Sequence, residues 1–287
     1  MRAYEDWVIE AEIKGLKLSE VILQNQMEEL EQTEQALFQR MNTNLKVMRE
    51  SAEAGLIGKR RSLSGLVGGD AAKVESYRKK GKSLVGELMS GAIAKALAVA
   101  EINACMGRIV AAPTAGSCGV LPAVLLTVEE ACQISERELI LGLFTAAGLG
   151  MILAERASVS GAEGGCQAEI GSATAMAAAA AVELAGGSPR QTADAAAIAM
   201  KSMLGLVCDP VGGLVEVPCV KRNATGATIA LTAAEMALSG VKSAIPIDEV
   251  IDTMARIGKQ MSCALKETAQ GGLAVSSTGR RIQADFL

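Results

Sequence analysis

Apolar residues recur at helical spacing over the first part of the chain. Between residues 4 and 50 they mostly stand three or four positions apart, at Leu23, Met27, Leu30, Leu37, Met41, Leu45 and Met48. This period predicts a long amphipathic helical segment over residues 1–50, with Ser19 at an N-cap. Glu34 and Asn44 interrupt the apolar face. We expect this face to pack on the protein's own core rather than on a partner, as amphipathic stripes usually do.

Helical patterns also cover most of the remaining chain. They predict helices from Asp70 to Tyr77 and over Ser83–Arg108, Ala123–Ala131, Glu136–Ala157, Ala173–Leu184, Pro189–Leu206, Ala224–Ser239 and Ile247–Thr268. Segments rich in glycine or proline separate them, at residues 62–70, 113–122, 161–166, 208–219 and 270–279. No repeat and no linker divides the chain. The sequence therefore predicts an all-α protein with a single helical domain over residues 1–287, in which Ala175–Ala181 lies deep in the core.

Composition supports the helical prediction and narrows the function. Half of the residues are hydrophobic but only 2% are aromatic, which favours helices over large sheets. The net charge is −4 without a dense basic stripe, so we expect no nucleic-acid partner. The uncharged stretch Ile109–Val128 contains prolines and glycines, and Leu139–Ala154 is short, so we expect no membrane span. The first residues lack the apolar core of a secretory signal, and we expect a cytoplasmic protein.

The chain has seven cysteines and no histidine. The absence of histidine removes the commonest general base and the commonest zinc ligand. Cysteines in helical pattern are expected in the core: Cys105, Cys132 and Cys263. Those in the glycine-rich breaks are candidates for a metal site: Cys166, Cys208 and Cys219, with Cys118 in a further break. From spacing alone, a shared metal site and buried structural cysteines both stay open, because no CxxC pair is present.

The sequences around these cysteines resemble a known family. Ser160–Gly171 reads SGAEGGCQAEIG, and Gly205–Asn223 reads GLVCDPVGGLVEVPCVKRN. Together with Ala112–Pro122 and Lys266–Ala274, they are similar to the cluster-binding segments of the bacterial iron–sulfur L-serine dehydratases. The resemblance extends over about residues 20–275.

The resemblance implies a chemistry. In that family the cysteines matching Cys166, Cys208 and Cys219 hold a [4Fe-4S] cluster, on which the glycine-rich loops would converge. The fourth iron lacks a protein thiolate and can act as a Lewis acid on the β-hydroxyl of L-serine. The expected enzyme is an L-serine ammonia-lyase, a carbon–nitrogen lyase that forms pyruvate and ammonia in serine catabolism and gluconeogenesis. Pyridoxal phosphate, the usual alternative cofactor, is not expected, because no lysine lies in the motif of that class.

Substrate contacts and the proton acceptor are less clearly marked. Ser64, Gly65, Thr114 and Gly116 offer hydroxyls and N–H groups where helices begin, which suits a carboxylate, although glycines there can also simply serve turns. Asn223 is a further candidate for orienting the substrate. Ser117 and Lys266 are the local candidates for catalytic proton transfer.

The family resemblance also implies a partner. Its members have a second, beta region with a serine-rich segment and a histidine, which this chain lacks. We therefore expect the alpha chain of a heterodimer or larger hetero-oligomer with a separate beta chain. Some single-chain relatives cap the open iron with a C-terminal cysteine, whereas this sequence ends in Asp285–Leu287. Two alternatives stay open: a cysteine desulfidase with the same cluster chemistry, and a non-catalytic helical scaffold subunit.

Overall fold

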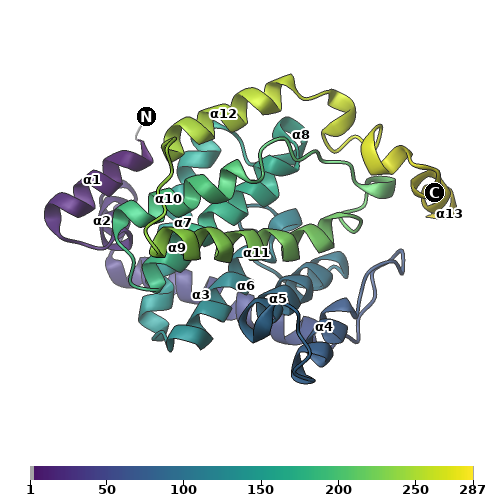
Figure 1. Ribbon diagram of the computed structural model, residues 1–287, viewed down its shortest axis with the longest axis horizontal. Helices are drawn as coiled ribbons and strands as arrows, with labels where there is room; N and C mark the ends of the chain where they lie inside the picture. The colour runs from purple at the N-terminus through teal and green to yellow at the C-terminus, as the bar shows by residue number, and fades with distance from the viewer. Residues whose placement is uncertain (1–2, 287) are drawn as a thin grey trace.

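Helices carry most of the chain in the computed structural model, which describes residues 3–286 (Figure 1). The α-helices are α1 (Tyr4–Lys14), α2 (Leu18–Glu29), α3 (Glu34–Leu56), α4 (Asp70–Lys79), α5 (Gly86–Ala104), α6 (Val120–Cys132), α7 (Glu136–Arg156), α8 (Gly161–Gly164), α9 (Ser172–Leu184), α10 (Pro189–Lys201), α11 (Cys219–Leu238), α12 (Ile247–Gln260) and α13 (Ser277–Phe286). No β-strand occurs between residues 3 and 286, so the prediction of an all-α fold is confirmed. Residues 1, 2 and 287 of the predicted domain lie outside the described residues.

Short turns of other helical types link these elements. The 3-10 turns are η1 (Ala115–Ser117), η3 (Val211–Gly213), η4 (Cys263–Leu265) and η5 (Gly272–Val275). A π-helix, η2 (Gln167–Gly171), runs directly into α9. All of these irregular pieces except η4 lie within or beside a glycine-rich break of the sequence, and half of the candidate site residues lie on or next to them.

Helix α9 is the centre of the core. Every residue of Ser172–Leu184 is buried, and α6, α7, α10 and α11 pack around it (Figure 1). Alanine occupies most positions of this helix, and its small side chain lets neighbouring helices approach from all sides. The prediction that Ala175–Ala181 lies deep in the core is confirmed.

The N-terminal segment is not one long helix, and that prediction was wrong. Gly15 ends α1 in a left-handed conformation with φ 65°. Thr33 starts α3 as its N-cap, where its hydroxyl accepts a hydrogen bond from the Ala36 N–H at 3.3 Å. Ser19 is not an N-cap but the second residue of α2, and its N–H donates to Glu183 at 3.0 Å. The apolar faces of these three helices do pack on the protein's own core, as expected.

Two further predicted helices end early. Helix α10 stops at Lys201, and α12 stops at Gln260 rather than at Thr268. After α12 the chain turns through left-handed residues, Glu267 at φ 62° and Ala269 at φ 55°, which a right-handed helix cannot contain. This turn brings the segment after Ser262 to the candidate site instead of extending the helix.

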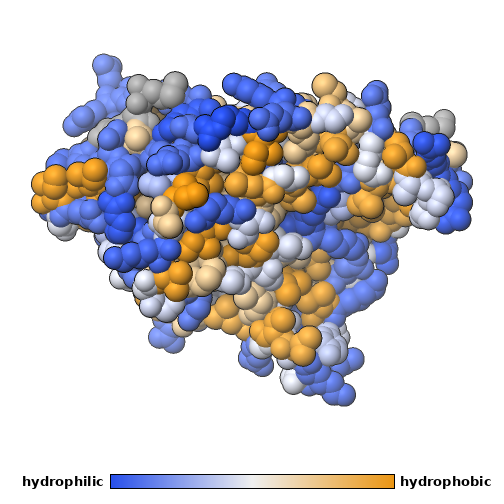
Figure 2. Space-filling model, turned by 45° about the horizontal axis from the view of Figure 1, so that its top comes forward, coloured by the Kyte–Doolittle hydropathy of each residue, from blue (hydrophilic) through white to orange (hydrophobic). Residues whose placement is uncertain are grey.

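Two stretches are long and apolar enough to cross a membrane by composition, Ala115–Cys132 and Glu136–Arg156. However, 67% of each is buried inside the protein, which is typical of core helices. The surface itself mixes polar and apolar residues, and Figure 2 shows several apolar patches between charged ones.

Helices α3 and α5 cross at a contact that only glycine permits. A Cβ atom at Gly55 would lie 2.2 Å from the Ala98 carbonyl oxygen. We expect Gly55→Ala to lower the free energy of unfolding by about 3 kcal/mol, because rigid backbone cannot move aside as a side chain can. Gly91→Ala in α5 is the control, since its nearest neighbour would be the flexible end of Lys95 at 3.6 Å. That variant should be about 0.5–1 kcal/mol more stable than the parent. Denaturant unfolding followed by circular dichroism compares them, and equal effects would contradict this account.

Candidate functional site

The cysteines predicted as cluster ligands lie on three separate segments. Cys166 directly precedes η2, Cys208 lies in the loop after α10, and Cys219 is the first residue of α11. The segment after α12 runs beside Cys208: the Cys208 N–H donates to the Leu265 carbonyl and the Glu267 N–H donates to the Cys208 carbonyl, both at 2.8 Å. These bonds form a parallel bridge between Cys208 and Lys266.

The three thiols lie near enough to one another to affect their mutual ionisation. Burial raises the pKa of Cys166 to about 11 and that of Cys219 to about 12, and it raises the pKa of Cys208 as well. Cys166 adds to the rise of the pKa at the other two cysteines, and Cys219 adds to it at Cys208. Cys166 and Cys208 are each only 3% exposed. Burial therefore disfavours the ionised form of each of these thiols, and they repel one another when ionised.

These thiols are a suitable donor set for an iron–sulfur cluster. Among residues 3–286, no group of three or more Cys, His, Asp or Glu side chains is arranged around a single metal ion. A cluster makes a different demand, because each of its irons takes its own cysteine and the thiols need not converge on one point. Ionised thiolates that repel one another would be stabilised by such a positively charged centre.

Arg222 holds the loop that carries Cys208. It lies one helical turn after Cys219, and its guanidinium donates to the Val207 carbonyl at 2.8 Å and to the Asp209 carboxylate at 2.9 Å. Asp209 is buried and also accepts the Leu273 N–H at 2.8 Å. The positive charge of Arg222 lowers the pKa of the Cys166 thiol, which partly offsets the effect of burial. From the sequence, a contact of Arg222 with the substrate carboxylate and an unpaired surface role were both open, and the structure shows the side chain paired with Asp209.

Asn223 joins two of the motifs. Its Oδ1 accepts the Gly119 N–H at 2.8 Å, and its Nδ2 donates to the carbonyls of Gly116 at 2.8 Å and Cys219 at 3.0 Å. The side chain is 1% exposed. We predicted a substrate contact for Asn223, and the structure shows its amide bonded to backbone groups of the loop before α6 and the start of α11.

Glu169 lies where the remaining motifs meet. Its Oε1 accepts the Thr114 hydroxyl at 2.7 Å, and Thr114 Oγ1 lies 3.1 Å from Ser117 Oγ. A Cβ atom at Gly161 would lie 2.7 Å from Glu169 Oε2 and 3.2 Å from Cys208 Sγ. The carboxylate therefore stands between the Thr114 loop and the cysteines.

The environment of Glu169 disfavours its charge. Burial raises the pKa of this carboxyl, the Thr114 hydrogen bond opposes the rise, and the like charge of Glu267 adds to it. Glu169 was not predicted as a site residue, although it follows Cys166 by one helical turn within a matched motif.

Comparison with known proteins identifies the family. Residues 13–274 match the sequence profile described as serine dehydratase alpha chain. The chain belongs to this family. A probable L-serine dehydratase alpha chain of Bacillus subtilis is 54% identical over 270 residues, which cover 94% of this chain and 90% of the relative. The L-serine dehydratase alpha chain of Peptoniphilus asaccharolyticus is 42% identical over 274 residues, covering 96% and 94%.

A longer relative matches in part. The L-serine dehydratase TdcG of Escherichia coli is 48% identical over 182 residues, which cover 63% of this chain but 40% of that protein. The predicted family and the predicted enzyme class, a carbon–nitrogen lyase, are confirmed by these matches.

Ser64 and Gly65, which we predicted as substrate contacts, belong to a different group of residues from the Thr114–Glu169 pair. The hydroxyls of Ser62 and Ser64 both donate to the buried Glu216 carboxylate, which lies just before Cys219. Gly65 has a left-handed φ of 76°, with no atom within 4 Å of a hypothetical Cβ. That geometry supports the role in a turn that the sequence analysis left open. Lys266 is half-buried, and no hydrogen bond or ion pair of its amino group is found in the described chain.

The remaining cysteines of the alpha chain divide differently from the prediction. Cys118 is buried and packs against Ala52, Val99 and Leu126. Cys132 and Cys263 are exposed, so their assignment to the core was wrong. Both lie at the end of a helical segment, Cys132 as the last residue of α6 and Cys263 as the first of η4, where a side chain turns to solvent.

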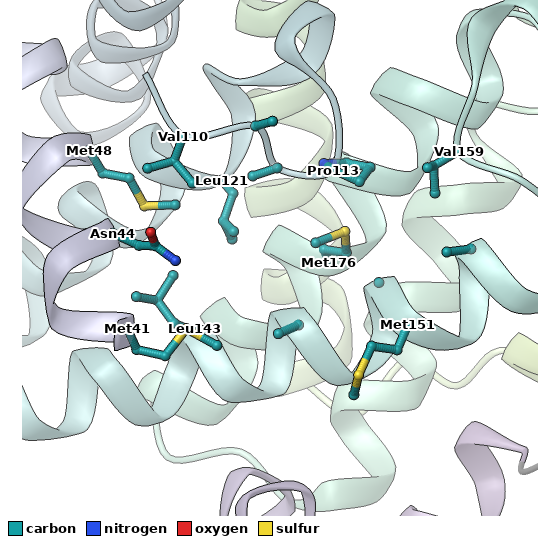
Figure 3. A pocket seen from close by; sticks show the side chains of 15 residues that line it. Met41, Asn44, Met48, Val110, Pro113, Leu121, Leu143, Met151, Val159 and Met176 are labelled. Atoms are coloured by element: carbon teal, nitrogen blue, oxygen red, sulfur yellow. The ribbon is translucent and has the colours of Figure 1, made fainter. Parts of the chain in front are cut away.

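A separate hollow of about 340 Å³ opens between α3, α7 and the loop before Thr114 (Figure 3). Figure 3 shows the side chains of Met41, Met48 and Met176 around it, with Asn44 as a polar group. Asn44, which interrupts the apolar stripe of the sequence, is exposed where it lines this hollow. Because charged groups need polar partners when they are desolvated, this hollow does not suit a free amino acid.

The buried amide of Asn223 yields a stability prediction. Asn223→Asp places an oxygen opposite the carbonyls of Gly116 and Cys219, and we expect a loss of about 3 kcal/mol in unfolding free energy. Asn103→Asp is the matched control, because Asn103 makes one exposed hydrogen bond, to Ala115, and should lose under about 1 kcal/mol. Chemical denaturation of the metal-free chain measures both. Equal stability of the two variants would rule out the bridging role of Asn223.

Proposed function

We propose that this chain is the alpha subunit of an L-serine dehydratase that converts L-serine to pyruvate and ammonia, with a [4Fe-4S] cluster on Cys166, Cys208 and Cys219. The observation that carries the proposal is the proximity of three thiols, of which Cys166 and Cys208 are buried and Cys219 is half-buried, and which act on one another's ionisation. It is supported by relatives whose names include L-serine dehydratase alpha chain.

The cysteines would each bind one iron, which leaves one iron of the cluster without a protein thiolate. When bound, the cluster would supply a Lewis acid that polarises the β-hydroxyl of serine and helps it to leave. The chain's own residues have to favour the thiolate form of the cysteines and hold the loops that carry them. Arg222 favours the thiolate of Cys166, and the Arg222–Asp209 pair with the Cys208–Lys266 bridge fixes the loops.

Removal of the α-proton needs an acceptor, and the chain has no histidine. We keep Ser117 and Lys266 as candidates for proton transfer. Ser117 is fully buried and contacts Thr114, while Lys266 is joined to Cys208 through the backbone. Thr114 and Gly116 lie in the same loop. The Thr114 hydroxyl already donates to Glu169, so the backbone at Gly116 is the part of this loop that suits the substrate carboxylate.

A separate beta chain is part of the proposal. Leu63 is 97% exposed and Met106 is 92% exposed. Leu63 stands between Ser62 and Ser64, which bond to Glu216 beside the Cys219 loop. Contiguous exposed apolar surface is typical of a protein interface, and Leu66, three residues after Leu63, is exposed as well. We infer that the beta chain covers this loop and contributes groups that the alpha chain lacks.

Anaerobic reconstitution with iron and sulfide tests the cluster assignment. We expect the wild-type chain to gain air-sensitive visible absorbance and, with its beta chain, to form pyruvate from L-serine. Cys208→Ser should reduce bound iron to background, because one of the three ligands is lost. Cys132→Ser, an exposed cysteine away from the site, should retain both iron and activity.

Full iron content in Cys208→Ser would exclude this ligand set. Faster turnover of L-cysteine than of L-serine would favour a desulfidase, and L-threonine completes the comparison. A chain that binds no iron at all would instead favour a scaffold subunit.

The proposed interface yields a separate prediction. Leu63→Glu should weaken binding of the beta chain about 10-fold or more, because it places a charge in an apolar contact. Leu84→Glu is the control, since Leu84 is 98% exposed but lies in the loop between α4 and α5. Analytical ultracentrifugation of the mixed chains measures both affinities. A weaker affinity for the Leu84 variant alone would contradict the proposed position of the interface.

A further inference from the structure

Glu169 is an ionisable residue in an otherwise buried segment. It lies on the π-helix η2, between Ala168 and Ile170, which are both 1% exposed. Glu169 itself is only partly buried. Single π-turns are rare and occur often at functional sites, where they re-aim a side chain. Here the π-turn follows Cys166 immediately and presents a carboxylate toward the loops that carry Thr114 and Cys208.

One oxygen of the Glu169 carboxylate accepts a hydrogen bond within the protein, and the other accepts none from the described residues. Oε1 accepts the Thr114 hydroxyl at 2.7 Å. No hydrogen-bond donor to Oε2 is found among residues 3–286. Oε2 is the oxygen on the side of Gly161 and Cys208. The available acceptor therefore faces the cysteines that would hold the cluster.

Glycines keep the space around both oxygens open. A Cβ atom at Gly116 would lie 3.2 Å from Oε1, and one at Gly161 would lie 2.7 Å from Oε2. Neither glycine has a left-handed φ, so their conformation does not by itself require glycine. The missing side chains are explained by the need for room beside the carboxylate.

No basic side chain of the described chain forms an ion pair with Glu169. Arg222, whose charge acts on Cys166, is already bonded to Asp209 and to the Val207 carbonyl. The other charge that acts on Glu169 is Glu267, which has the same sign. A partly buried carboxylate without a cation is costly, and a bound cation would remove that cost.

The substrate of the proposed function carries such a cation. L-Serine has a carboxylate, a hydroxyl and an α-ammonium group. The first two suit hydrogen-bond donors and an electrophilic metal, whereas an ammonium group needs an anionic acceptor. We propose that the Glu169 carboxylate binds the α-ammonium group of the amino-acid substrate through Oε2, with Thr114 holding the carboxylate in place. This inference rests on the proposed function and extends it to the recognition of the amino group.

A pair of ligands tests the proposal on the cluster-loaded alpha chain in complex with its beta chain. L-Serine carries the ammonium group, and 3-hydroxypropanoate is the same molecule without it. Binding is read from the change in the visible absorption of the cluster, and competitive inhibition and KM are measured in parallel. Glu169→Gln keeps the size and the acceptor for Thr114 but removes the charge. Iron content is determined for every variant.

We expect Glu169→Gln to weaken L-serine binding and raise its KM about 10- to 100-fold, because a charge-assisted hydrogen bond is lost. Binding of 3-hydroxypropanoate should stay within about 3-fold of the wild type, since it never used this contact. Glu163→Gln, an exposed carboxylate on α8 of the same motif, is the matched control and should change neither ligand.

Equal weakening of both ligands, or loss of kcat with an unchanged KM for L-serine, would overturn the proposal. If Glu169→Gln does not keep its iron, Glu169→Asp is compared instead, because it retains the charge on a shorter side chain. Glu169→Asp should weaken the binding of L-serine more than the binding of 3-hydroxypropanoate. Loss of iron in both variants would overturn the proposal and assign Glu169 to retention of the cluster. Failure of the proposed function would be distinct, because then the wild-type complex itself would bind no cluster or form no pyruvate.

Discussion

Three thiols held close together, two of them buried and the third half-buried, are the constraint around which the rest of this structure is arranged. Burial and mutual repulsion both oppose their ionisation, yet a metal cluster needs them as thiolates. The fold keeps the three thiols close together, despite this repulsion, through side-chain and backbone hydrogen bonds between their loops. Asn223 connects the loop before α6 to the start of α11, and a parallel bridge connects Cys208 to Lys266. Asp209 connects the Cys208 loop to α11 through Arg222 and to η5 through the Leu273 N–H.

Three core helices begin close to this site. Helices α6, α9 and α11 pack on one another, and each begins at or just after one of the glycine-rich motifs. The partial positive charge at the start of α11 favours a thiolate at Cys219. The alanine-rich centre of α9 allows these helices to lie close together, so their first residues can converge. The irregular backbone lies at one end of an otherwise regular helical core, where the cysteines and Glu169 can face a common space.

The sequence predicted the fold class, which the structure confirms, because helical periodicity is a local signal. The assignment of Cys166, Cys208 and Cys219 as cluster ligands came from the family resemblance and stays a prediction. Helical periodicity is read within a few turns, and each cysteine is marked by its own glycine-rich neighbours. The long N-terminal helix failed because the breaks at Gly15 and Thr33 interrupt a stripe whose spacing barely changes. Glu169 could not be assigned because its partner Thr114 is 55 residues away in sequence. Asn223 was linked to the site by its neighbours, but its bonds to Gly116 and Gly119 become visible only in three dimensions.

The central claim concerns three thiolates around one cluster. An anaerobic crystal structure of the reconstituted chain, with anomalous scattering recorded at the iron edge, tests it most directly. The account predicts one compact group of irons bound by the sulfurs of Cys166, Cys208 and Cys219, with one iron facing the Glu169 carboxylate and free of protein sulfur. Iron bound at other residues, or a structure in which these three sulfurs point to different faces, would contradict it.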